Sequence, residues 1–330
     1  MTALLTVDNL EVQIKKRKST TEIIKGVSFS IEKGEIFALV GESGSGKSMT
    51  TQAISGMLPR NIDVSADKLV FNDRQLNRLK DKEWTAIRGT EIGMVFQDPM
   101  TSLNPTVTIG KQLMEIFTVK KKMSKKAARE QAIRLLEDVE IALPEARLKQ
   151  YPHELSGGMR QRVLIAMAVA LSPQLIIADE PTTALDVTTQ KQILNLLYKL
   201  KEQSDSAVLL ITHDLGVVAE IADKVGIMYS GRIVETGTVE DIFHHPKHPY
   251  TIGLLSSLVG EQTDKEKPLH SIKGTPPQAG QITEGCPFAS RCPLTMSVCL
   301  THYPPAYQTG QHSAHCWLLD DRAEGARVND

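Results

Sequence analysis

The sequence predicts an α/β fold in which helices flank a mainly parallel sheet. A Gly/Ser-rich loop lies between an apolar strand at 36–40 and a helix, the order found in strand, phosphate loop and helix motifs. Two further apolar strands, within 173–183 and 206–214, are separated by a segment with helical spacing. This alternation is typical of a parallel sheet.

Composition and charge exclude some classes of protein. Of the 330 residues, 41% are hydrophobic and 23% charged, and the formal net charge is -1, so nothing in the overall charge indicates a nucleic-acid partner. The longest apolar run, Val163–Leu171, is far below the roughly 18 residues that a membrane-spanning helix needs. The first residues also lack the pattern of a secretory signal. We expect a cytosolic, reduced protein that reaches a membrane only through partners.

The chain divides into a core and an extension. Alternating apolar residues up to about Lys33 predict an antiparallel β edge. Helical spacing predicts a mainly helical insert from about 100 to 172, with Ser124 as the N-cap of one helix. Past about Phe243 the chain becomes rich in Pro, His and Gly. We therefore expect a domain at 1–245 and a C-terminal extension at 246–330.

The Gly/Ser-rich loop matches the phosphate-loop pattern G-x-x-x-x-G-K-[ST]. Glycines let backbone N–H groups close around phosphate oxygens, and the following helix adds its positive N-terminus. Lys47 would reach the β- and γ-phosphates and Ser48 would ligate Mg²⁺. A mere Gly-rich turn would not explain why strand, lysine, serine and helix occur together. The residues expected at the nucleotide are Gly41, Glu42, Ser43, Gly44, Ser45, Gly46, Lys47, Ser48 and Met49.

Two adjacent carboxylates follow the apolar strand at 175–178. Asp179 is expected to hold hydrated Mg²⁺, and Glu180 to polarise the water that attacks the γ-phosphate. An isolated Asp-Glu pair after a strand is more often structural. Its distance downstream of a phosphate loop favours the catalytic interpretation.

A third motif narrows the class. Leu155-Ser156-Gly157-Gly158-Met159, followed by an apolar helix, resembles the signature motif of ABC ATPases. The resemblance implies a RecA-like P-loop ATPase core that binds ATP and Mg²⁺. It also implies a head-to-tail dimer, in which Ser156, Gly157, Gly158 and Met159 contact the γ-phosphate held by the opposite chain.

The resemblance extends over residues 1 to about 245. Gln97 corresponds to the family's glutamine loop, which senses Mg²⁺ and the attacking water, and Asp186, in Ala184-Leu185-Asp186, to an aspartate that crosses the dimer interface. His213 corresponds to the switch histidine at the γ-phosphate. One position departs from the pattern: the family usually stacks adenine on an aromatic residue in the first strands, and this chain offers Ile14, with no aromatic before Phe29.

The extension resembles that of ATPase subunits of dipeptide and oligopeptide permeases, and related nickel importers share much of its plan. Its motifs are HHPKHPY, KGTPP and four cysteines. The segment MRQRVLIAMAVA further resembles the D-type subunit of these permeases. The resemblance implies a paralogous F-type ATPase as partner, two transmembrane permease subunits and an extracytoplasmic substrate-binding protein. It places the chain on the cytoplasmic face of the cell membrane.

Four cysteines, and no others, follow residue 285: Cys286, Cys292, Cys299 and Cys316. Their spacing does not match common zinc patterns, and a cytosolic setting argues against a disulfide. The residues alone leave a cluster, a Zn²⁺ ion and free thiols open, with His302, His312 and His315 as further zinc ligands. The resemblance to the permease subunits implies a [4Fe-4S] cluster.

Two other functions are compatible with an ABC-type chain. A soluble ABC ATPase of translation or DNA repair would carry a second cassette or a long coiled coil, and the sequence has one phosphate loop and neither extension. A regulatory subunit without turnover would not need Glu180 and His213. Within the importer interpretation, a nickel or metal-chelate substrate is an alternative to peptides.

Overall fold

A computed structural model describes residues 3–16, 19–183, 185–257, 272–281 and 284–325. The chain forms two compact units, one of Met1–Leu79 with Ile211–Asp330 and one of Lys80–Leu210. Each unit is described by itself. In the part of the chain that is described, no helix combines the length and the apolar character that crossing a bilayer requires.

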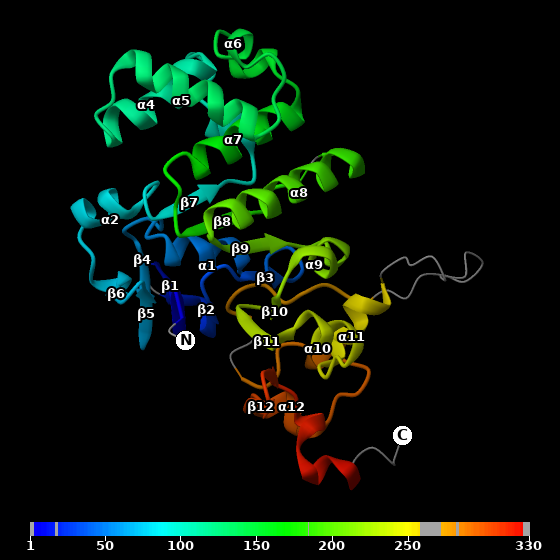
Figure 1. The fold of residues 1–330 in the computed structure, drawn as a ribbon. Coiled ribbons are helices and arrows are strands. Elements are labelled where there is room, and N and C mark those ends of the chain that lie inside the picture. Colours follow the sequence, from blue (N-terminus) through cyan, green and yellow to red (C-terminus); the bar gives the residue numbers. More distant parts are fainter. Residues whose placement is uncertain (1–2, 17–18, 184, 258–271, 282–283, 326–330) are drawn as a thin grey trace. The chain divides into compact units, whose positions relative to one another are not determined.

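An antiparallel sheet opens the first unit (Figure 1). It comprises β1 (Leu5–Lys16), β2 (Ser19–Ile31), β4 (Ile62–Ser65), β5 (Lys68–Phe71) and β6 (Arg74–Gln75). The order is β2-β1-β5-β6, and β4 pairs with β1. Apolar residues of β1 and β2 that alternate in the sequence are buried, among them Leu5, Val7 and Ile24. The predicted antiparallel β edge is confirmed.

The first unit also contains the strand before the phosphate loop. β3 (Ile36–Val40) pairs in parallel with β10 (Lys224–Tyr229), which pairs antiparallel with β11 (Arg232–Thr238). The tail extends this sheet, because β13 (His312–Ala314) pairs with β11 and β12 (Tyr307–Thr309) pairs with β13. Pairing through backbone groups therefore joins the C-terminal extension to the core sheet.

Helices and short turns complete the first unit. They are α1 (Lys47–Ile54), η1 (Leu76–Arg78), α9 (Leu215–Ile221), α10 (Val239–His244), α11 (Pro249–Ser256), η3 (Ala289–Arg291), α12 (Ser297–Thr301), η4 (Trp317–Leu319) and η5 (Asp321–Gly325). Tyr229, Tyr250 and Phe288 are fully buried and pack ring against ring, with centroids 4.6–5.3 Å apart. These aromatic contacts fix the tail residue Phe288 against β10 and α11.

Parallel pairing is also found in the second unit. There β7 (Ile92–Val95) pairs in parallel with β8 (Leu175–Asp179). A Cβ atom at Gly93 would lie 2.4 Å from the carbonyl oxygen of Ala168, so only glycine lets this strand approach its covering helix. α2 (Asp81–Ile87) and α8 (Val187–Ser204) belong to the same unit, and β9 (Ala207–Thr212) begins in it. The predicted α/β alternation is confirmed.

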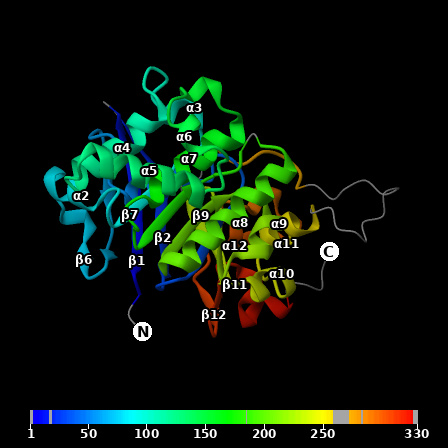
Figure 2. The same ribbon diagram turned by 45° about the horizontal axis from the view of Figure 1, so that its top comes forward.

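The segment from 99 to 169 contains helices and no strand (Figure 2). These are α3 (Pro99–Ser102), α4 (Ile109–Lys120), α5 (Lys125–Asp138), α6 (Pro144–Arg147), η2 (Pro152–Glu154) and α7 (Gly157–Val169). Ser124 caps α5, because its hydroxyl accepts the N–H of Ala127 at 3.3 Å. The compact units divide near residues 80 and 211, whereas the expected boundary at 245/246 lies inside the first unit and remains a prediction.

A buried pair fastens the tail to β11. Nε2 of His312 lies 2.7 Å from Oε1 of Glu235. Oε1 also accepts the N–H of Lys247, and Oε2 accepts the N–H of His248. Glu235 is fully buried. We expect His312→Ala to lower the free energy of unfolding by about 1–3 kcal/mol, because it removes one hydrogen-bond partner from the buried carboxyl group of Glu235. Urea unfolding would measure this.

The exposed His302 provides the matched control, since His302→Ala should change stability by less than about 0.5 kcal/mol. Equal effects of the two substitutions would contradict the anchoring role of the pair.

Candidate nucleotide site

The phosphate loop connects β3 to α1, in the context that its motif requires. Gly44 and Gly46 have φ angles of 78° and 109°, a region that favours glycine. A Cβ atom at Gly41 would lie 2.2 Å from the carbonyl oxygen of Met228. The loop backbone therefore adopts this path only with glycine at these positions.

The loop fits an anion that carries several acceptor oxygens. The Ser45 hydroxyl is buried and has no hydrogen-bond partner among the described residues. Nζ of Lys47, also buried, donates to the carbonyl oxygens of Gly41 and Glu42 at 2.7 and 3.1 Å. No side chain caps the N-terminus of α1. A buried hydroxyl, an ammonium group and a helix N-terminus together match the chemistry of a phosphate group.

Other residues expected at the loop differ in exposure. Ser43 and Gly44 are exposed, whereas Ser48 and Met49 are half-buried in the first turn of α1. The Ser48 side chain thus lies on the same turn as Lys47.

In the second unit, the structure brings Gln97 and Glu180 together. Nε2 of Gln97 donates to a carboxylate oxygen of Glu180 at 2.9 Å, and the hydroxyl of Thr183 donates to the same oxygen at 2.9 Å. The parallel register pairs Val95 with Ala178, so residues two positions farther along, Gln97 and Glu180, leave the same sheet edge. Asp179 is the last residue of β8 and is buried.

Glu180 has a left-handed backbone, with φ of 46°. A non-glycine residue rarely adopts this conformation, which occurs more often at functional sites. Thr183 was not predicted as a site residue, because a threonine three positions after a glutamate carries no sequence signal.

The signature segment begins α7 in the second unit. The Ser156 hydroxyl caps this helix by accepting the N–H of Met159 at 3.3 Å. Ser156 and Gly157 are exposed, and a Cβ atom at Gly158 would lie 2.7 Å from a methyl carbon of Thr189. The helix N-terminus is accordingly accessible from outside, and glycine at 158 permits close packing on α8.

Asp186 has a local structural role. Its carboxylate caps α8 by accepting the N–H and hydroxyl of Thr189 at 3.0 and 2.7 Å, and these bonds hold its pKa below the usual range. The side chain is exposed at the chain's surface. Ala184, which belongs to the same motif, lies outside the described residues.

His213 and the first strands complete the set of predicted positions. His213 is exposed and directly follows β9, in the first unit. Phe29 is buried and stacks on Phe37 at a centroid distance of 4.8 Å, so its ring is committed to the core. Ile14 is half-buried in β1. Phe29 therefore does not replace the aromatic residue on which the family stacks adenine.

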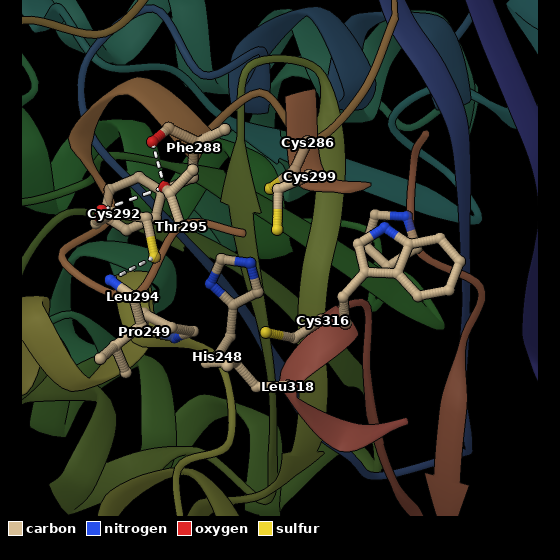
Figure 3. A pocket seen from close by; sticks show the side chains of 13 residues that line it. His248, Pro249, Cys286, Phe288, Cys292, Leu294, Thr295, Cys299, Cys316 and Leu318 are labelled. Atoms are coloured by element: carbon tan, nitrogen blue, oxygen red, sulfur yellow. Dashed lines mark hydrogen bonds between the residues drawn. The ribbon is translucent and has the colours of Figure 1, made fainter. Parts of the chain in front are cut away.

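The four cysteines line one pocket of the tail (Figure 3). All four are free thiols, and His248, Phe288 and Trp317 also line the pocket. Burial and the neighbouring cysteines raise the pKa of Cys286 to about 11 and that of Cys316 to about 12. Burial lowers the pKa of His248 to about 3, so its imidazole is neutral. The pocket brings together four thiols that the sequence separates by up to 30 residues.

The thiols are not arranged as a single-ion site. No group of three or more His, Cys, Asp or Glu side chains in the described ranges is placed to hold a metal ion. The histidines considered as zinc ligands have other contacts: His312 pairs with Glu235, and Nδ1 of His315 lies 3.1 Å from the carbonyl oxygen of Pro304. The Zn²⁺ alternative with these histidines is therefore not supported.

Known proteins resemble both parts of the chain. The family described as "ABC transporter" matches residues 24–183, and "Oligopeptide/dipeptide transporter, C-terminal region" matches 234–299. The "Dipeptide transport ATP-binding protein DppD" of Bacillus subtilis is 51% identical over 99% of this chain and 98% of its own length. The chain belongs to the ABC transporter family. The "Oligopeptide transport ATP-binding protein OppD" of the same organism is 49% identical, over 97% of this chain and 90% of its own length.

Solved structures of the family agree with the fold. The dimeric post-hydrolysis state of the ATP-binding cassette MJ0796, bound to ADP and phosphate, has a TM-score of 0.63 at 30% identity. It covers 71% of this chain and 98% of its own. The predicted P-loop ABC ATPase fold is confirmed, and the tail with its four cysteines is an addition to that cassette.

Proposed function

We propose that this chain is the ATP-hydrolysing subunit of an ABC importer that takes up dipeptides or oligopeptides. The observation that carries the proposal is an intact phosphate loop and Gln97–Glu180 pair in a chain about half identical to DppD over nearly its full length. The transported peptide never touches this chain. The proposal places the chain at the cytoplasmic face of the membrane as a peripheral subunit, without a nucleic-acid partner.

Each predicted motif position has a proposed task in hydrolysis. The loop amides, Ser45 and Lys47 bind the phosphates, and Glu180 accepts a proton from the attacking water while Gln97 and Thr183 orient its carboxylate. His213 contacts the γ-phosphate. Ser48, Gln97 and Asp179 would hold Mg²⁺, which neutralises charge on the transferred phosphoryl group.

A second chain is needed to complete the site. Ser156, Gly157, Gly158, Met159 and Asp186 would act on the nucleotide of the opposite chain, and the exposed N-terminus of α7 supports this. The dimeric state of the MJ0796 cassette supports it as well. We propose a paralogous F-type ATPase as the partner, together with two permease subunits and a substrate-binding protein.

Reconstitution would test the importer assignment. The chain would be co-expressed with the products of neighbouring permease genes and placed in proteoliposomes. Hydrolysis stimulated by a binding protein loaded with peptide would support the proposal, whereas stimulation only by a nickel-chelate protein would assign the alternative substrate. Full hydrolysis without any membrane subunit, unaffected by adding them, would favour a soluble ATPase.

The tail is proposed to hold a [4Fe-4S] cluster on Cys286, Cys292, Cys299 and Cys316. The support is that the four thiols line one pocket. A Zn²⁺ ion holds each sulfur at about 2.3 Å, so its four sulfurs must nearly touch, whereas a four-iron cluster spreads its ligands over a cube. The cavity of about 20 Å³ admits one water-sized group and not a four-iron cluster, so binding a cluster would require the four thiols to move apart.

Anaerobic purification with iron, sulfide and zinc analysis would test the cluster. We expect about four irons per chain and their loss in Cys286→Ser, because one thiolate ligand of the cube would be missing. Ser290→Ala, in the same segment but not lining the cysteine pocket, is the matched control and should keep its iron. Zinc, or no metal in the wild type, would withdraw the cluster and leave the ATPase assignment intact.

A further inference from the structure

Arg291 connects the cysteine-bearing tail to the phosphate loop. Its guanidinium makes a two-pronged bond to the Glu42 carboxylate, with Nη1 at 2.8 Å from Oε2 and Nη2 at 3.1 Å from Oε1. The two residues are 249 positions apart in the sequence. The Arg291 side chain is only 6% exposed. A bidentate, largely buried pair of this kind has a defined geometry, unlike an ion pair on a solvated surface.

Arg291 is held in place by its own surroundings. Nε donates to the carbonyl oxygen of Lys273 at 3.0 Å, and Nη1 also donates to the hydroxyl of Tyr229 at 3.2 Å. The guanidinium carbon lies 5.9 Å from the ring centre of Phe288. Burial alone would lower the pKa of Arg291, but the hydrogen bonds to Glu42 and Tyr229 outweigh it and raise the pKa. The side chain is therefore always charged.

Glu42 is fixed at three of its polar groups. Its carboxylate bonds to Arg291, its backbone N–H donates to the Tyr250 hydroxyl at 3.0 Å, and its carbonyl oxygen accepts Nζ of Lys47 at 3.1 Å. One residue of the phosphate loop thus holds Lys47 through its carbonyl oxygen and Arg291 through its carboxylate. Without Arg291 this negative charge would be unpaired, at a loop that has to receive the negative phosphates of ATP.

The cysteine pocket is contiguous with this contact. Cys292 directly follows Arg291 in the chain, and Phe288, which packs on Tyr229 and Tyr250, lines the same pocket as the four cysteines. Residues that line the cysteine pocket therefore lie next to Arg291 in the chain and pack on the aromatic residues around it.

We propose that Arg291 is a positioning residue for ATP binding, which neutralises and fixes Glu42 and thereby couples the packing of the cysteine pocket to nucleotide affinity. This inference rests on the proposed function in one respect, which is that MgATP is the ligand of the phosphate loop. Arg291 touches neither the nucleotide nor the reacting atoms; it acts through Glu42 and Lys47.

The test is the dissociation constant of MgATP, measured by titration calorimetry on the full chain purified anaerobically. Arg291→Ala should raise the dissociation constant about tenfold. This loss of affinity is smaller than the loss of a directly contacting charged pair can cause. The Arg291→Ala/Glu42→Gln double variant should bind MgATP at least about threefold more tightly than Arg291→Ala, since the unpaired charge is gone. Arg322→Ala is the matched control, because it removes another bidentate pair of the tail, with Asp320, and should leave affinity unchanged.

A second experiment substitutes a cysteine of the pocket. Cys292→Ser should weaken MgATP binding about threefold in the wild type and have no effect in the Arg291→Ala/Glu42→Gln background. An unchanged affinity in Arg291→Ala, a failure of Glu42→Gln to restore it, or equal effects of Cys292→Ser in both backgrounds would each overturn the inference. If the wild-type chain itself bound no MgATP, both this inference and the proposed function would be wrong.

Discussion

Glu180→Gln is expected to slow ATP hydrolysis by about 10²- to 10⁴-fold and to leave MgATP binding within about threefold of wild type. The amide keeps the shape of the side chain but accepts no proton from water. In the wild type, Gln97 and Thr183 each donate to Glu180 at 2.9 Å. The carbonyl oxygen of the glutamine can still accept both hydrogen bonds, so the local geometry should survive. Single-turnover hydrolysis and equilibrium binding of ATP, measured on the same preparation, would separate the two quantities.

Glu202→Gln is the matched control for this experiment. Glu202 is an exposed carboxylate of the same unit, paired only at the surface with Lys201, and its replacement should leave hydrolysis unchanged within about twofold. Parallel loss of binding and hydrolysis in Glu180→Gln would assign Glu180 to nucleotide binding. Unchanged hydrolysis would remove it from the reaction altogether.

The sequence predicts local parts of the site better than distant contacts. The phosphate loop occupies consecutive residues, so glycine spacing and the flanking strand are enough to predict its conformation. The Gln97–Glu180 bond joins residues 83 positions apart. It depends on the parallel register of Val95 with Ala178, which no local pattern specifies. Family resemblance indicated both residues, but not that they bond to each other.

The tail illustrates what local patterns miss. β12 and β13 have three residues each, too few to show the alternation that predicts a strand. Their pairing with β11 makes part of the predicted extension continuous with the core sheet. Arg291 likewise carries no signal in sequence, because its partner Glu42 lies at the other end of the chain. Cysteine spacing indicated a shared site only through resemblance, since spacing alone does not determine which thiols meet.

Lys47→Ala is the second substitution with a large expected effect, and it acts on binding. The buried ammonium is the cation of the loop and donates to the carbonyl oxygens of Gly41 and Glu42. Removing one partner of a desolvated charge pair costs about 2–5 kcal/mol, which corresponds to about 30- to 5,000-fold weaker MgATP binding. AMP, which lacks the β- and γ-phosphates that this ammonium is proposed to contact, should lose much less affinity than ATP.

The comparison of ATP with AMP distinguishes a phosphate contact from a damaged loop. A loop that collapsed without Lys47 would lose affinity for both nucleotides and lower the unfolding temperature of the nucleotide-free chain, whereas loss of a charge contact affects ATP selectively. Lys33→Ala, an exposed lysine in the turn before β3, should change neither quantity. Loss of ATP binding in Lys47→Ala, set beside loss of turnover with intact binding in Glu180→Gln, would assign the two side chains to separate steps of the reaction.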